Sequence, residues 1–124
     1  MERVIYNFYN KFKVSYKDGT YEFGVYSKRD GHFVKIDLNK FEIEKLILYI
    51  IAFLFFDIKY DVKSIKKGQV ICHFTKKLFI IKYEDYKIYI YSEIKGNHYY
   101  IYLSDKEFKK FAYKLIKFYI TGVV

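Results

Sequence analysis

The sequence predicts an α+β fold made of two tandem strand-strand-strand-strand-helix (ββββα) repeats, each an antiparallel sheet with one helix packed on one face. Two observations predict this fold. The chain resembles itself when it is shifted by 65 positions, so that Tyr21 falls on Tyr86 and Gly31 on Gly96. Within each half, runs of alternating apolar and polar residues precede a single helical segment. We therefore expect one domain, residues 1–124, with a first repeat at 1–58 and a second at 66–124.

The first repeat contains four segments in which apolar and polar side chains alternate, as they do in half-buried strands. In the segment 32–38, Val34, Ile36 and Leu38 share one side, while Phe33 and Lys35 lie on the other. The motif KRDG before this segment and the motif KDG further upstream are typical of tight hairpin turns. We expect strands at 5–9, 11–17, 20–27 and 32–38, and matching strands in the second repeat.

Both repeats end in a segment that begins with the same helix-capping chemistry. Asn39 is followed three residues later by Glu42, and Ser104 is followed in the same way by Glu107. This spacing is the capping box, in which each side chain accepts a hydrogen bond from the backbone amide of the other residue. We therefore expect one helix to start after Asn39 and another after Ser104.

The two expected helices differ in polarity. The second is amphipathic, with lysines opposite an apolar side formed by Phe108, Phe111, Ala112, Leu115 and Tyr119. The first is apolar on all sides over residues 46–56, a run that is about half as long as a membrane span. Only one side of this helix is needed to cover a sheet. We therefore expect a homo-oligomer that forms through the helix at 40–56, and no membrane span.

The compartment is expected to be a reducing one. The single cysteine, Cys72, excludes an internal disulfide, and the N-terminal segment lacks the apolar stretch of a signal peptide. Proteins that use cysteine in this way are typical of the cell interior. We expect an intracellular protein, either cytoplasmic or associated with the nucleoid.

The composition favours a polyanionic partner. The formal net charge is +9, and the chain contains 16 tyrosines and 13 phenylalanines. On a sheet surface, tyrosine rings can stack on unpaired bases while lysines contact phosphates. This combination of residue types predicts a weakly sequence-selective binder of single-stranded DNA or RNA.

The expected binding surface is the sheet face that no helix covers. In the first repeat the alternation defines this face, and the same register shifted by 65 defines it in the second. The shift also places Leu78 and Ile80 on the outer face, which indicates that part of this face is buried. The residues expected to contact nucleic acid are Lys11, Lys13, Lys17, Tyr26, Lys35, Lys76, Lys82, Lys87, Tyr89, Tyr91, Tyr100 and Tyr102.

A family resemblance leads to the same expectation. The segments YYIYLSDKEFKKFAYKL (99–115) and VKIDLNKFEIEKL (34–46) resemble parts of the Whirly, PUR-repeat and PC4-like single-stranded nucleic-acid-binding proteins. PC4-like chains have a similar last strand that runs into a serine-capped helix with a glutamate in its first turn. The resemblance implies that single strands bind along sheet surfaces, without catalysis or a cofactor. The lysine-glycine-lysine-alanine signature of Whirly proteins has no counterpart here, which leaves the subfamily open.

Two other functions remain open at this point. Tyrosine pairs across strands also stabilise sheets that bind nothing. The chain would then be a protein-interaction or oligomerisation module, such as a small inhibitor from a virus or mobile element. Glu84 and Asp85 before Lys87 loosely resemble a nuclease site, although acids at a hairpin are usually turn formers. We expect no enzyme, no cofactor and no metal site, because the histidines are scattered and no glycine-rich phosphate loop is present.

Overall fold

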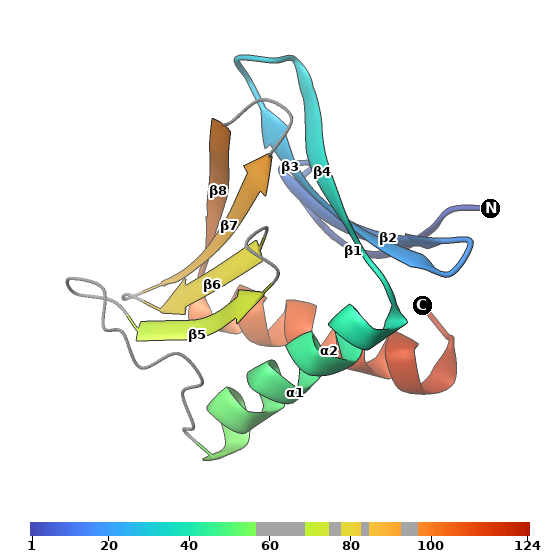
Figure 1. The fold of residues 1–124 in the computed structure, drawn as a ribbon. Coiled ribbons are helices and arrows are strands. Elements are labelled where there is room, and N and C mark those ends of the chain that lie inside the picture. The colour runs from blue at the N-terminus through green and yellow to red at the C-terminus, as the bar shows by residue number, and fades with distance from the viewer. Residues whose placement is uncertain (57–68, 75–77, 83–84, 93–96) are drawn as a thin grey trace.

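The computed structural model describes residues 1–56, 69–74, 78–82, 85–92 and 97–124, except for the side chains of 69–74, 79, 81, 91, 92 and 97. The predicted α+β class, with antiparallel sheets and two helices, is confirmed (Figure 1). The strands are β1 (Arg3–Phe8), β2 (Phe12–Lys17), β3 (Thr20–Ser27), β4 (His32–Leu38), β5 (Gln69–Phe74), β6 (Leu78–Lys82), β7 (Tyr86–Ser92) and β8 (Asn97–Leu103), and the helices are α1 (Lys40–Phe56) and α2 (Asp105–Thr121).

The strands of each sheet lie in chain order. The first sheet has the order β1-β2-β3-β4 and the second has the order β5-β6-β7-β8. Tyr21 pairs with Leu38 across β3 and β4, and Tyr86 pairs with Leu103 across β7 and β8. Because sequential antiparallel strands need only short connections, each sheet is a meander built from local hairpins.

The hairpin between β2 and β3 shows how local sequence fixes a register. Asp18 and Gly19 have φ angles of 51° and 81°. A type I′ turn needs this left-handed conformation at both central positions, and glycine adopts it without steric cost while aspartate tolerates it. Lys17 pairs with Thr20 directly across the turn. The motif KDG therefore starts β3 at the predicted residue.

The two helix starts differ in their capping. At α1 the Asn39 amide donates to Glu42 Oε1 at 3.0 Å and the Glu42 amide donates to Asn39 Oδ1 at 2.9 Å, so the predicted capping box is confirmed. At α2 the Glu107 amide donates to Ser104 Oγ at 3.2 Å. The Glu107 carboxylate, however, accepts the hydroxyl of Tyr6 at 2.7 Å, because β1 lies within its reach. Burial of Tyr6, followed by this bond, raises the pKa of its hydroxyl far above the usual value.

Helix α2 follows the second sheet in the chain but packs mainly against the first. The ring of Phe111 is fully buried and lies 5.5 Å from the ring of Phe12 in β2 and 6.3 Å from that of Phe23 in β3. The start of α2 packs on its own sheet, where Phe108 stacks on Tyr86 of β7 with ring centroids 3.8 Å apart. The prediction that each helix covers its own sheet is therefore wrong for most of α2.

Helix length explains this arrangement. Each helix has 17 residues, so it is about 26 Å long, whereas four strands span only about 15–20 Å. Helix α1 starts after β4, and near its end Phe53 packs edge-on against Tyr86 of β7, with ring centroids 6.3 Å apart. Figure 1 shows the two helices side by side beneath both sheets. The buried apolar side chains of both sheets and both helices form one cluster.

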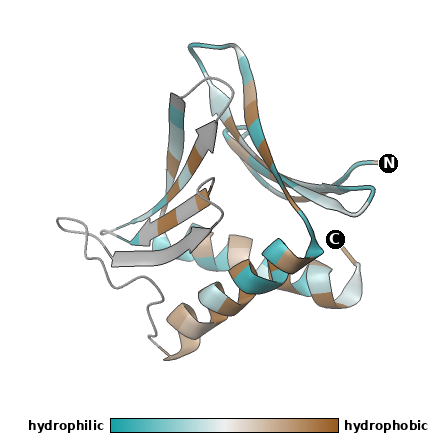
Figure 2. Cartoon of the chain, viewed as in Figure 1, coloured by the Kyte–Doolittle hydropathy of each residue, from teal (hydrophilic) through white to brown (hydrophobic). Residues whose placement is uncertain are grey.

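The solvent-facing sides of the helices differ in hydropathy. Figure 2 shows apolar colouring over much of α1, while polar and apolar residues alternate along α2. Ile43, Leu46 and Ile50 of α1 are buried, whereas Phe41 and Leu48 are exposed. Within the described residues, neither helix combines the length and the hydropathy that a bilayer span requires.

Candidate nucleic-acid interface

The outer face of the second sheet, opposite its helix-covered side, holds a group of three tyrosines around one lysine. The Lys87 ammonium in β7 lies 4.2 Å from the ring centroid of Tyr100, 5.6 Å from that of Tyr89 and 6.0 Å from that of Tyr102. Tyr100 and Tyr102 in β8 are 52% and 48% exposed, and their rings meet edge to face at 5.5 Å. We name these four residues the tyrosine cluster.

Strand pairing explains why the members of the tyrosine cluster meet. Lys87 pairs with Tyr102, and Tyr89 pairs with Tyr100. Directly opposite residues of neighbouring antiparallel strands carry their side chains on the same face, about 5 Å apart. The Tyr89 hydroxyl is also hydrogen-bonded to Nδ1 of His98, and the two rings lie 5.2 Å apart. The cluster is therefore positioned by the pairing of β7 with β8.

The electrostatics of the tyrosine cluster are those of a cation held over aromatic rings. A lysine within about 6 Å of a ring centroid is attracted by the negative face of the ring. Lys87 is near three rings, and among the described residues no carboxylate forms an ion pair with it. Within the described residues, aromatic rings rather than a paired carboxylate therefore surround the positive charge at this site.

The outer face of the first sheet carries a second, smaller aromatic group. The rings of Tyr26 and Phe33 meet edge to face at 5.6 Å, and the Lys13 ammonium lies 5.8 Å from the centroid of Phe33. Phe33 lies over Gly24, where an added Cβ would come within 3.2 Å of the Phe33 ring. Glycine at this position therefore lets the ring lie flat against the strand.

The cations of this first face are matched by acids. Lys13 pairs with Glu2 at 3.5 Å and Lys35 pairs with Glu22 at 3.7 Å. Asp37, which pairs with Glu22 in the strand register, is exposed. The charges of Lys13 and Lys35 are therefore offset by carboxylates on this face, which favours a phosphate backbone less than the second face does.

The other predicted lysines are placed as follows. Lys17, the last residue of β2, is exposed and shares the face of Lys13 by strand alternation, while Lys11 is exposed in the turn before β2. Lys76 lies outside the described residues, and so does the side chain of Tyr91, whose backbone is part of β7. Of the predicted residues, the structure thus brings together Lys87, Tyr89, Tyr100 and Tyr102 on one face, and Lys13, Lys17, Tyr26 and Lys35 on another.

The predicted placement of Lys82 on the outer face is wrong. Its ammonium lies 3.6 Å from Asp105 Oδ1 of α2 and 4.2 Å from the ring centroid of the buried Tyr86, on the helix-covered side of the sheet. Leu78 and Ile80, which the shift by 65 also placed outside, are buried at 0% and 1% exposure. The side chains of Leu78, Ile80 and Lys82 in β6 therefore point to the face opposite to the predicted one.

The reason is a difference of one residue in hairpin length. Tyr16 pairs with Tyr21 across the β2–β3 hairpin, a separation of five residues, while Lys82 pairs with Tyr86 across the β6–β7 hairpin, a separation of four. A slip of one residue moves every side chain of a strand to the other face. The correct equivalence between β2 and β6 is therefore a shift of 66.

On the helix-covered side of the second sheet, a polar group forms at the start of α2. Its members are Lys82, Tyr86, Asp105 and Lys109. Asp105 accepts bonds from Tyr86 Oη at 3.2 Å and from Lys109 Nζ at 2.9 Å. The bond to Lys109 is the main cause of the lowered pKa of Asp105, while burial followed by the Asp105 charge raises the pKa of Tyr86. This group fixes the start of α2 to the second sheet and has no free cation to offer a ligand.

Comparisons with protein-family models, with characterised proteins and with solved structures find no match to this chain. In the part of the chain that the structure describes, no three metal-ligating side chains gather in one place.

Sequence reasoning gave no role to two features of the outer faces of the sheets. One is the hydrogen bond between His98 and Tyr89, and the other is the pairing of first-sheet lysines with Glu2 and Glu22. The strand register signals Glu22, because Glu22 and Lys35 share the outer face on neighbouring strands.

Proposed function

We propose that this protein binds single-stranded nucleic acid, without catalysis and with weak sequence selectivity, on the outer face of its second sheet. One observation carries the proposal: Tyr100 and Tyr102, each about half exposed, flank the ammonium group of Lys87 on a face that neither α1 nor α2 covers. An exposed ring stacks on a base whatever its identity, and each such stack is worth about 1–3 kcal/mol. A lysine beside the rings meets the phosphate that follows the base.

The geometry favours single strands over duplexes. The tyrosine cluster lies on a sheet surface, and its rings can reach the faces of bases only if those bases are unstacked. In a duplex the base faces are hidden, so only the charge of Lys87 and of other exposed lysines would act. We therefore expect a single-stranded oligonucleotide to bind more tightly than a duplex of the same length.

We also propose that the chain is a duplicated ββββα unit, with repeats at 1–58 and 66–124 in one domain. The bounds of α1 and α2 differ by 65 at both ends, and so do those of β4 and β8. Both sheets have the same strand order, and both have a register irregularity between their first two strands. The resemblance to Whirly, PUR-repeat and PC4-like proteins leads to the same proposal for the ligand.

The test is a titration of fluorescently labelled single-stranded oligonucleotides, followed by polarisation at two salt concentrations. The substitutions Tyr100→Ala and Tyr102→Ala should each weaken binding by about 5- to 150-fold, the equivalent of one lost base stack. Tyr113→Ala is the matched control, because this tyrosine is 66% exposed but lies on α2. Wild-type affinity in the variant that lacks both Tyr100 and Tyr102 would refute the stacking proposal.

Substitution of two lysines, one on each face of the second sheet, tests which face binds nucleic acid. Lys87→Ala should reduce the dependence of log affinity on log salt by about 0.7, the value for one phosphate contact of a single strand. Lys82→Ala should leave that slope unchanged, because Lys82 lies on the helix-covered side and pairs with Asp105. Equal slopes for the two variants would show that Lys87 does not contact phosphate. No binding by the wild-type protein at low salt would favour an interaction module instead.

A further inference from the structure

A line of exposed apolar side chains runs along α1. Phe41, Leu48 and Phe55 are 78%, 60% and 72% exposed, and each follows the previous one by seven residues. Residues seven apart lie on the same side of a helix, and apolar residues with this spacing form the contact line between paired helices. The opposite side of α1 holds Ile43 and Ile50, which are buried in the core. We name Phe41, Leu48 and Phe55 the outer line. Because these three side chains are exposed, the core of one chain does not use them.

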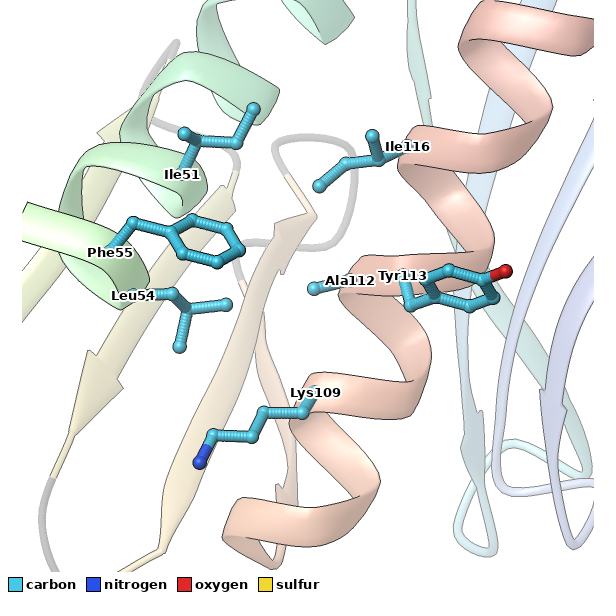
Figure 3. Close-up of a pocket in the computed structure, with 7 residues that line it drawn as sticks. All are labelled: Ile51, Leu54, Phe55, Lys109, Ala112, Tyr113 and Ile116. Carbon is cyan, nitrogen blue, oxygen red and sulfur yellow. The ribbon is translucent and has the colours of Figure 1, made fainter.

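A groove continues this line toward α2. Ile51, Leu54 and Phe55 of α1 face Ala112 and Ile116 of α2 across a groove (Figure 3). The volume of this groove is about 510 Å³. Phe56, next to the groove, is also exposed. An exposed apolar surface of this extent marks an interaction site.

We propose that a second copy of this chain covers this surface, with α1 packed antiparallel against α1 of the partner about a two-fold axis near Leu48. In this register, Phe41 lies opposite the partner's Phe55, because both are seven residues from Leu48. The contact is therefore self-complementary, as a two-fold interface must be. Phe56 then lies at the edge of the contact, beside the groove.

The distribution of charge favours a second copy of this chain as the partner, and it favours the antiparallel orientation of the two α1 helices. Two charged residues lie beside the outer line: Lys45 is exposed, whereas Glu44 is half-buried and accepts a hydrogen bond from the hydroxyl of Tyr119. In the antiparallel register Lys45 lies opposite Ile51 of the partner subunit, and the two helix dipoles oppose each other. A parallel pair would place the two Lys45 side chains face to face. An acidic protein or an anionic bilayer would instead favour the solvent side of α2, which carries the exposed residues Lys106, Lys110, Lys114 and Lys117.

The available area is in the range of a stable dimer. An aromatic side chain presents about 150–250 Å², so Phe41 and Phe55 at their observed exposures offer about 220–380 Å² together. Leu48, Phe56 and the rim of the groove add a comparable area. The total approaches the roughly 800 Å² per partner that standard interfaces bury.

The first experiment measures mass in solution without nucleic acid, so its result does not depend on the proposed function. Sedimentation of the wild-type protein should give twice the chain mass of 15.2 kDa. Leu48→Glu should give a monomer with an unchanged circular dichroism spectrum, because Leu48 is exposed within one chain. Lys114→Glu on α2 is the charge control and should remain a dimer. A wild-type monomer at about 100 μM, which is far above the Kd of a stable dimer, or a dimeric Leu48→Glu variant, would overturn the proposal.

Cysteine cross-linking tests the register independently. In a Cys72→Ser background, Leu48→Cys should form a disulfide between chains on oxidation, since residues at the axis come within the roughly 7 Å that a disulfide needs. Phe41→Cys should cross-link to Phe55→Cys in a mixture but not to itself. Self-linking of Phe41→Cys would refute the antiparallel register. Binding of the monomer to vesicles of anionic phospholipid, with no cross-link at residue 48, would assign the surface to a membrane instead.

Discussion

Replacing Phe111 with alanine tests how the two halves of the molecule are held together. Phe111 belongs to α2 but is fully buried against the first sheet, with its ring 5.6 Å from that of Tyr6 and 5.5 Å from that of Phe12. Truncating a buried phenylalanine costs about 3–5 kcal/mol, and each lost ring pair accounts for about 0.5–1.5 kcal/mol. We expect a loss near 4–5 kcal/mol of unfolding free energy, because the Phe23 and Phe108 rings also lose a partner.

Urea unfolding followed by circular dichroism measures this loss, and hydrogen exchange locates it. Because Phe111 bridges α2 and the first sheet, amides of β1, β2 and β3 should exchange faster in Phe111→Ala. Tyr113→Ala on the exposed side of the same helix is the control and should change stability by no more than about 0.5 kcal/mol. A loss below about 2 kcal/mol, which is below the range for buried aromatic truncations, would refute the reasoning. So would faster exchange confined to the second sheet.

Three further predictions concern caps and buried tyrosines. Asn39→Ala should cost about 1 kcal/mol in urea unfolding, because it removes the capping bond to the Glu42 amide; an unchanged midpoint would contradict this. Tyr6→Phe should cost about 1.5 kcal/mol in the same assay, since its hydroxyl donates to the charged Glu107 carboxylate; a more stable variant would count against the bond. Tyr86 has a folded pKa raised above 10.0, so its neutral form stabilises the fold below pH 10 and that contribution is lost as the pH rises further. Stability followed by circular dichroism should decline above that pH, and Tyr86→Phe should flatten the decline; an equal decline in both proteins would show that Tyr86 is not responsible.

Local signals in the sequence predicted the local structure well. The motif KDG fixes the β2–β3 turn because only certain residues adopt two successive positive φ angles. Asn39 and Glu42 predict the start of α1 because both capping partners lie within four residues of each other. At Ser104 the same signal was only half correct, since Glu107 bonds to Tyr6, about a hundred residues away. Capping rules contain no information about what a fold brings close to a helix start.

The faces of the second sheet were harder to predict than its strands. The alternating pattern of β6 is weak because Leu78, Phe79, Ile80 and Ile81 are all apolar. The outer face was therefore inferred by transfer from the first half, and the shorter hairpin before Tyr86 made that transfer wrong by one residue. Lys87, Tyr89, Tyr100 and Tyr102 on β7 and β8 do share one face, because the interval between those strands is the same in both halves.

The two sheets have the same strand order but unequal outer faces, and this inequality bears on how a strand of nucleic acid would bind. On the first sheet, Lys13 and Lys35 already have carboxylate partners, so a phosphate would have to displace Glu2 and Glu22. On the second sheet, Lys87 lies among aromatic rings and no displacement of an acid is needed within the described residues. One chain should therefore bind one strand rather than two. The outer line of α1 lies on the helical layer, away from the tyrosine cluster, so pairing through α1 would leave both binding faces of a dimer open. A stoichiometry of one oligonucleotide per chain in both the wild type and the Leu48→Glu monomer is the outcome that this arrangement requires.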